Sequence, residues 1–199
     1  LTGISYETST ATQNVFKAAN GRSLGNVAND GVIYGDKMYL VVDQENTIEV
    51  LDKYTKKSIK QISTTALLGN AEGNEPRHII SYEGNVYFTT YGGYVAAVDT
   101  VNFDLKAKYQ VGNYPEGLSA YGEYIYVANS NYGMGGGNLS RISLTTGNVD
   151  TKNVEGINNP TVVFATMTGV YVVDNQYYDA SYNAYGENAF KIIDWAAGT

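Results

Sequence analysis

The stretch Gly35-Asp-Lys-Met-Tyr39-Leu-Val-Val-Asp43 decides the fold, because shorter versions of it return three more times along the chain. The later copies read Gly84-Asn-Val-Tyr87-Phe-Thr-Thr, Gly122-Glu-Tyr-Ile-Tyr126-Val-Ala-Asn129 and Gly169-Val-Tyr171-Val-Val-Asp174. A short apolar run precedes each copy, and a second run follows it and ends in an acid or hydroxyl residue. Periods of about 40 to 50 residues built from short strands are typical of a β-propeller. Each repeat therefore predicts one antiparallel blade, and the fold class is all-β.

Turn chemistry supports this prediction. The glycine that opens each copy falls between the first and second strands of its blade, where a tight hairpin needs positive φ. Proline opens the first strand of three blades, where its missing N–H group does least harm; these residues are Pro76, Pro115 and Pro160. The acids Asp52, Asp99 and Asp194 are expected to start Asx-type turns between strands three and four. The recurring tyrosines Tyr39, Tyr87, Tyr126 and Tyr171 are expected in equivalent, largely buried places between blades.

The repeat divides the chain into blades at approximately residues 1–17 (partial), 30–64, 76–113, 115–156 and 159–199, the last lacking its fourth strand. The chain begins in a strand-three pattern at Thr2–Tyr6, followed by a strand-four pattern at Gln13–Phe16. It ends at Thr199, where strand three of the last blade should turn into strand four. We therefore predict one β-propeller domain that is a contiguous piece, about four to five blades, of a seven-bladed ring. A five-bladed closed ring with an irregular seam is the alternative.

Composition limits the chemistry. The chain has 19 Tyr and 22 Gly among its 199 residues but no Cys, so disulfides and thiolate metal sites are impossible. The net charge of −7 and the lack of a basic patch argue against nucleic acid. His78 is the only histidine, which excludes a histidine-cluster metal site. No apolar run is long enough to span a membrane. We expect no metal and no cofactor.

The blades differ most in the loop between strands two and three. From the recurring tyrosine to the end of strand three there are 17 residues in blade three (126 to 143) and 23 in blade four (171 to 194), against 13 (39 to 52) and 12 (87 to 99). These loops emerge at the same rim as the connections from strand four to strand one, because neighbouring strands run antiparallel. Tyr, Asn and Gly in such loops are typical of recognition surfaces. The predicted ligand-binding residues are Arg77, His78, Asn129, Asn131, Tyr132, Tyr177, Tyr178, Tyr182 and Tyr185; the alternative is that the loops are merely solvated.

Catalysis finds less support. A Ser–His–Asp triad using His78 is conceivable, but no sequence near it resembles a nucleophile elbow. An enzyme would need convergent acids where the inner strands start, and Asp30, Glu75 and Glu116 are the only candidates. The segment Asp43-Gln-Glu45-Asn46 offers oxygen ligands but lacks the spacing of a known calcium loop. We therefore predict no catalytic residues.

The stretch Tyr114-Pro-Glu-Gly-Leu118 leading into Tyr126-Val-Ala-Asn129 resembles the repeat of YVTN-type (YncE-like) seven-bladed propellers. The stretch from Asn20 to Tyr39, continued by Asn46-Thr-Ile-Glu-Val-Leu-Asp52, is similar to surface lipoprotein propellers of gut bacteria, some of which capture vitamin B12 (cobalamin) for an outer-membrane transporter. The resemblance implies a non-enzymatic, extracytoplasmic protein that is anchored at the cell surface by a lipid outside this chain. Its implied ligand is small and amphipathic, possible examples being cobalamin and other corrinoids.

Two other functions stay open. The same tyrosines could recognise a protein or a carbohydrate, which would make the propeller an interaction scaffold. A lactonase-like or lyase-like propeller enzyme, using carboxylates and a metal in the central channel, is the third hypothesis.

Overall fold

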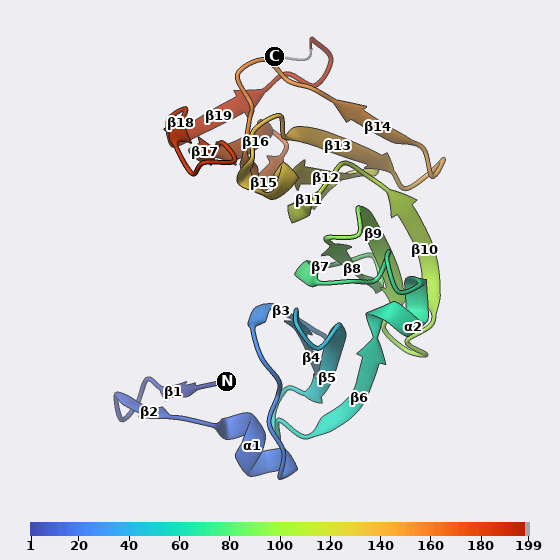
Figure 1. Cartoon of the computed structure of the whole chain (residues 1–199). Coiled ribbons are helices and arrows are strands. Elements are labelled where there is room, and N and C mark those ends of the chain that lie inside the picture. Colours follow the sequence, from blue (N-terminus) through green and yellow to red (C-terminus); the bar gives the residue numbers. More distant parts are fainter. Residues whose placement is uncertain (198–199) are drawn as a thin grey trace.

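The computed structural model describes residues 1–197 and consists almost entirely of antiparallel sheets that fan out around one inner edge (Figure 1). Blade one contains β3 (Ala28–Tyr34), β4 (Lys37–Val42), β5 (Thr47–Asp52) and β6 (Ser58–Ser63). Blade two contains β7 (Pro76–Tyr82), β8 (Asn85–Thr90), β9 (Tyr94–Asp99) and β10 (Leu105–Gln110). Blade three contains β11 (Pro115–Tyr121), β12 (Tyr124–Asn129), β13 (Asn138–Ser143) and β14 (Val149–Lys152). Blade four contains β15 (Pro160–Thr166), β16 (Gly169–Asp174) and β19 (Ala189–Ile193).

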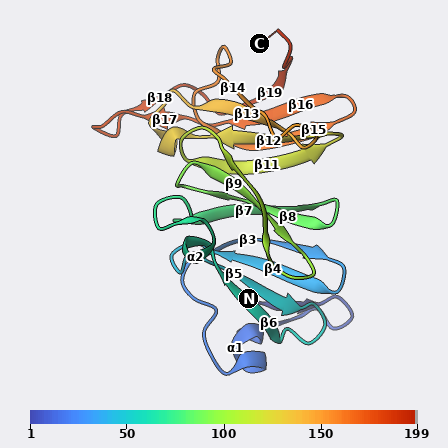
Figure 2. The same cartoon turned by 90° about the vertical axis from the view of Figure 1, so that its right-hand side faces the viewer.

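Strand order in each blade follows the sequence, from the innermost strand outward. Viewed from the side, the blades are stacked from blade one to blade four like successive layers (Figure 2). The expected all-β propeller of antiparallel blades is confirmed. The expectation that Thr199 lies at a hairpin turn falls outside the described residues.

The turns form as their residues predict. The glycines Gly35, Gly84, Gly122 and Gly169 all have positive φ, at 62°, 81°, 56° and 150°. Each of the three prolines is the first residue of its strand. Asp52 accepts hydrogen bonds from the backbone N–H groups of Tyr54 and Thr55, and Asp99 and Asp194 do the same two and three residues on. Local chemistry therefore fixes the hairpins on which the blades depend.

The core lies between blades. Tyr39, Tyr87 and Tyr126 are 0%, 6% and 9% exposed, each packed against the following blade. The expectation of burial is wrong for the fourth tyrosine: Tyr171 is only half-buried, because no described segment covers that side of blade four.

The N-terminal region departs from the repeat. A hairpin of β1 (Gly3–Ser5) and β2 (Thr10–Thr12) precedes the short helix α1 (Val15–Asn20). The strand expected at Gln13–Phe16 is therefore wrong: the strand ends at Thr12. Phe16 instead lies on the helix, which buries it against Leu40 and Leu51 of blade one. Burial of this one aromatic ring explains why the segment leaves the extended conformation.

Three smaller elements occupy the loops. Helix α2 (Thr64–Leu68) follows blade one and is capped by Ser63, whose Oγ accepts from the N–H of Ala66 at 3.2 Å. A 3-10 turn, η1 (Asn131–Gly133), and a two-stranded hairpin, β17 (Tyr177–Tyr178) with β18 (Ala184–Tyr185), lie in the long loops of blades three and four. No helix within residues 1–197 is long and apolar enough to cross a membrane.

The first strand of every blade has an irregular register at its start. The shifts fall at Ala28/Asp30, Pro76/Ile79, Pro115/Leu118 and Pro160/Val162. Such bulges re-aim side chains and are frequent next to functional sites. Here they turn the residues at positions 30, 77, 78 and 116 toward one another at the inner edge of the fan.

Candidate binding site

Arg77 lies at the centre of a polar cluster where the first three blades meet. It is the second residue of β7 in blade two, and it donates from Nη1 to Asp43 Oδ2 of blade one at 2.7 Å. Its Nε donates to Glu116 Oε2 of blade three at 3.1 Å. Burial would lower the pKa of Arg77, but the bonds to Asp43 and Glu116 outweigh it and raise that pKa. One permanently charged guanidinium therefore joins three blades.

Glu116 is almost fully buried and receives several donors. Besides Arg77, the hydroxyl of Tyr91 donates to its Oε1 at 2.6 Å, and the guanidinium carbon of Arg77 lies 4.6 Å from the Tyr91 ring centroid. Burial, followed by the bond to Glu116, raises the pKa of the Tyr91 phenol well above its usual value. Tyr91 thus stays protonated and holds the carboxylate in place.

His78 is flanked by two carboxylates. Its Nδ1 lies 3.2 Å from Asp30 Oδ2 of blade one, and its Nε2 lies 3.6 Å from Glu116 Oε2. Burial alone would raise the pKa of Asp30. Hydrogen bonds from His78 and from the backbone N–H groups of Ile79 and Gly31 outweigh that effect and hold the pKa below its ordinary value. Asp30 is therefore a charged carboxylate that hydrogen bonds from the protein stabilise, and it connects blades one and two.

Three tyrosines cover this cluster on the rim side. Tyr91 contacts Tyr114 edge-on, with ring centroids 5.0 Å apart, and Tyr114 contacts Tyr132 at 5.1 Å. Tyr114 and Tyr132 both have positive φ, at 49° and 58°, which is uncommon for an aromatic residue. Tyr114 is 37% exposed and Tyr132 is 64% exposed. The tyrosine cluster, meaning these three residues, therefore presents two ring surfaces to solvent.

A pocket of about 470 Å³ opens beside the tyrosine cluster. It is lined by Val27, Asp43, Gln44, Glu75, Arg77, Tyr91, Tyr114 and Tyr132. Its walls combine aromatic rings with carboxylates and a guanidinium, on loops that belong to three blades.

The hairpin β17–β18 extends this surface over blade four. The ring of Tyr177 stacks on that of Tyr185 at 5.7 Å. Gly135, at φ +76°, brings the blade-three loop so close to Tyr177 that a Cβ there would lie 2.6 Å from the ring. Tyr178 is 41% exposed and Tyr182, at the hairpin tip, is 86% exposed. The two long loops therefore lie against each other at the same rim.

The structure brings some of the sequence-predicted residues together and separates others. Arg77, His78 and Tyr132 belong to the polar and tyrosine clusters, whereas Tyr177, Tyr178, Tyr182 and Tyr185 form the hairpin. Asn131 donates from Nδ2 to the carbonyl of Gly135 and shapes the loop. Asn129 is only 1% exposed and donates to Asn138 and Ser140, so it supports the loop from beneath rather than lying on the surface.

Sequence reasoning missed Tyr91 and Tyr114, because neither lies in a long loop. A signal was present in the repeat. The residue after strand two donates its N–H to the residue before strand one in every blade, as Asp43 to Val27, Tyr91 to Glu75 and Ser130 to Tyr114. These paired positions all lie at the rim, and their side chains differ from blade to blade.

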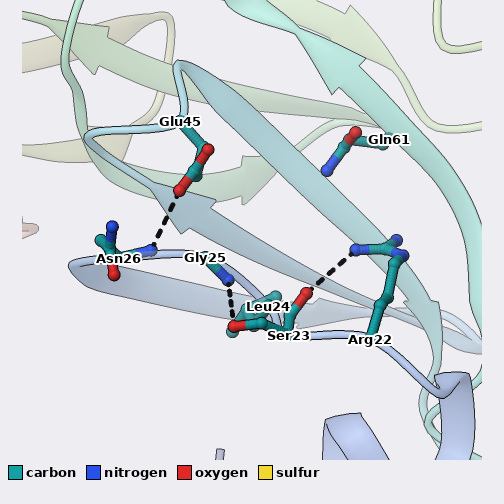
Figure 3. A pocket seen from close by; sticks show the side chains of 7 residues that line it. All are labelled: Arg22, Ser23, Leu24, Gly25, Asn26, Glu45 and Gln61. Carbon is teal, nitrogen blue, oxygen red and sulfur yellow. Dashed lines mark hydrogen bonds between the residues drawn. The ribbon is translucent and has the colours of Figure 1, made fainter.

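A second pocket, of about 320 Å³, lies near the outer part of blade one (Figure 3). Glu45 accepts from the N–H of Asn26 at 3.3 Å beside it. The neighbouring Glu49 is fully buried and is held by Arg22 at 2.7 Å, with Ser58 and Gln61 as further donors. Its hydrogen bonds are satisfied within the protein, which indicates a structural role in holding the α1 segment to blade one.

The charged side chains of the polar cluster are paired with one another, and Tyr91 donates to one of them. Within residues 1–197 no group of three or more His, Cys, Asp and Glu side chains is arranged to hold a metal ion.

A family model described as "Domain of unknown function (DUF5074)" matches residues 2–183. No curated protein matches the chain. Among solved structures, the fold is similar to hydrazine synthase of Kuenenia stuttgartiensis (TM-score 0.68, 18% identity, 85% of this chain and 51% of that chain). It is also similar to the computationally designed Ika4 protein (0.61, 10%, 87% and 94%) and to BamB from Moraxella catarrhalis (0.54, 16%, 81% and 47%).

The chain spans about half the length of the hydrazine synthase and BamB chains that it matches. At these identities the likeness establishes the β-propeller fold alone.

Proposed function

We propose that this chain, which belongs to the family described as Domain of unknown function (DUF5074), is a non-enzymatic propeller that binds its ligand at the tyrosine-bearing rim. The observation that carries the proposal is the tyrosine cluster, whose exposed rings border a pocket of about 470 Å³. Pockets of this size, with aromatic walls and a few polar groups, are the usual form of small-ligand sites.

The hydrogen bonding of the charged side chains favours ligand binding over catalysis. A general acid or base must reach its substrate with a free proton position. Arg77, Glu116 and Tyr91 are bonded to one another, and Asp30 is bonded to His78 and two backbone N–H groups. A cluster of this kind fixes the geometry of the rim, and its own acids are engaged by these donors; Glu75, which also lines the pocket, lies outside the cluster.

We infer the ligand class from the rim geometry together with the sequence resemblance to cobalamin-capturing propellers. A corrinoid presents a broad apolar ring edged with amides. Tyrosine rings cover the apolar part, while tyrosine hydroxyls and loop amides bond the polar edge. On this proposal one edge of the ligand enters the pocket at Tyr114 and Tyr132, and the remainder lies toward Tyr178 and Tyr182.

The proposed setting follows from the same resemblance. The protein would work outside the cytoplasm as a cell-surface lipoprotein, anchored by a lipid outside residues 1–199. It would pass its ligand to an outer-membrane transporter.

The aromatic surface extends along the rim beyond the pocket, which favours a second candidate function: an interaction scaffold for a protein or a carbohydrate. Tyr182 is 86% exposed at the tip of a hairpin beyond the pocket, so the aromatic surface is longer than a small-molecule site needs. Such exposed aromatic residues are enriched at the hot spots of macromolecular interfaces.

Calorimetry with cobalamin tests the first proposal. Heat of binding that saturates at one ligand per chain supports it, whereas absence of heat with a correctly folded protein removes the corrinoid and leaves the scaffold. Binding accompanied by any conversion of the ligand, monitored by its visible spectrum, would contradict the non-enzymatic part.

A further inference from the structure

Blade four has an apolar face that no described residue covers. On the side away from blade three, Phe164 is 61% exposed, Phe190 is 68% exposed and Ile192 is 66% exposed. The strand pairing places Phe164 opposite Tyr171 and Tyr171 opposite Ile192, and the Tyr171 ring stacks on Phe190 at 5.6 Å. These four side chains form one continuous surface across three strands, which we name the blade-four face.

The repeat shows what such a face is for. In blade one the same register places Val32 opposite Tyr39 and Tyr39 opposite Val50. Tyr39 and Val50 are fully buried there, packed against Val86, Phe88 and Val98 of blade two. Blades two and three use the corresponding side in the same way. In three blade-to-blade interfaces of this molecule, the corresponding side of a blade therefore packs against the next blade.

The opposite end of the fan is different. Phe16 of α1 and Leu24 pack on Leu40 and Leu51, on the side of blade one that faces away from blade two. Helix α1 lies at that end of the molecule in Figure 1. A second copy could not place its blade-one side on the blade-four face without moving this segment. Head-to-tail pairing of copies is thus disfavoured by the structure.

We propose that the blade-four face is an interface for a further blade of the same repeat, which packs on it through the side that carries Val86, Phe88 and Val98 in blade two. The occupant is an antiparallel sheet whose facing side chains are branched aliphatic or aromatic. Contiguous apolar surface of this kind on a folded protein marks an interaction site. This inference is independent of the ligand proposed for the rim.

A fusion tests the proposal on the whole chain. In the repeat Asp194 corresponds to Asp99 and Thr199 to Asp104, so residues 105–156 can be appended after Thr199 in frame. They supply a fourth strand for blade four and then a copy of blade three. We expect a rise in Tm of roughly 10 °C, because the covered aromatic and aliphatic side chains leave water.

Matched variants show whether the face is responsible. Phe164→Ser with Phe190→Ser should leave the Tm of the unfused chain within about 2 °C, because both side chains are exposed there. In the fusion the same pair should remove most of the gain. Ile125→Ser with Val127→Ser, made only in the appended copy, should also remove most of the gain in Tm.

Three outcomes overturn the proposal. The first is an unchanged Tm both in this fusion and in a second fusion that appends residues 149–197. The second fusion is needed because one appended blade could fail to fold for reasons of its own sequence. The second is a gain that survives the variants on both sides. The third is sedimentation of the unfused chain as a dimer that Phe190→Ser dissociates, which would identify a second copy as the occupant.

Discussion

The guanidinium of Arg77 and the carboxylate of Glu116 connect two blades, with Nε 3.1 Å from Oε2. Arg77 reaches a third blade through Asp43, and the side chains of the two acids are only about a tenth exposed. A partly buried carboxylate without its counter-charge is strongly destabilising. The stability of the rim and the position of its tyrosines therefore depend on the same side chain.

Replacing Arg77 with Ala should lower the free energy of unfolding by about 3 kcal/mol, because it leaves Asp43 and Glu116 without their shared partner. Urea titration followed by tyrosine fluorescence measures the change. Arg77→Lys should recover only part of the loss, since an ammonium group cannot bond both carboxylates in the same planar fork or lie flat on Tyr91. Lys37→Ala, which breaks an ion pair with the exposed Asp36, is the control and should change stability by less than about 0.5 kcal/mol. Equal losses for Arg77→Ala and the control would contradict this account.

Asp30 should make stability depend on pH. Its pKa is lower in the folded protein than in the unfolded chain, so the charged form is the one that folding favours. Its contribution is therefore present above about pH 4 and is lost as the pH falls through the lowered folded-state pKa. Asp30→Asn should be less stable than the unmodified protein at neutral pH, and the difference should shrink in acid. Urea midpoints measured across this range test the sign, with Glu123→Gln on an exposed turn as the control. A difference that grows on acidification would show that Asp30 is protonated in the folded state.

Gly92→Ala should destabilise the protein by about 2 kcal/mol through overpacking. A Cβ at Gly92 would lie 2.3 Å from the carbonyl oxygen of Ala71 and 2.6 Å from that of Glu72, and both are backbone atoms that cannot rotate away. Gly147→Ala is an informative comparison, because Gly147 has φ +75° but open space around it. Only the left-handed backbone opposes that change, at about 1 kcal/mol. A larger loss at Gly147 than at Gly92, measured by thermal or urea unfolding, would refute the steric explanation.

Much of the fold could be predicted from the sequence, because the determinants of the blades are local. Glycine at the first hairpin, proline at the first strand and an acid at the last turn each act within a few residues. Burial of Tyr171 could not be predicted in this way, since it depends on what packs against blade four. The strand predicted at Gln13–Phe16 was wrong for the same reason: the helix that replaces it, Val15–Asn20, depends on the contact of Phe16 with Leu40 and Leu51.

The candidate site was predictable only in part. Long loops rich in tyrosine pointed to the rim, but the polar cluster arises from bulges that bring Asp30, Arg77 and Glu116 together across blades. Loop length also drew attention to Asn129, although its position in strand two matches that of Thr90, which is likewise buried. Aligning the blades by strand register, rather than by loop composition, distinguishes inward-facing positions from rim positions.

The last prediction concerns the ligand. If a corrinoid binds at the rim, Tyr132→Ala and Tyr114→Ala should each weaken cobalamin binding by about 2 kcal/mol, roughly thirtyfold, because binding energy concentrates in a few aromatic anchors. Tyr178→Ala and Tyr182→Ala, singly and together, extend the test to the blade-four hairpin. Tyr54→Ala is the matched control: Tyr54 is 74% exposed, but it lies in the turn between β5 and β6, at the opposite rim. Calorimetry on each variant gives the affinity, and unchanged Tm values show that the fold is intact.

Full affinity in both Tyr114→Ala and Tyr132→Ala would remove the tyrosine cluster from the site even if the protein binds cobalamin. A loss confined to the hairpin variants would place the ligand over blade four, where Tyr177 and Tyr185 already stack and fix the platform on which it would lie.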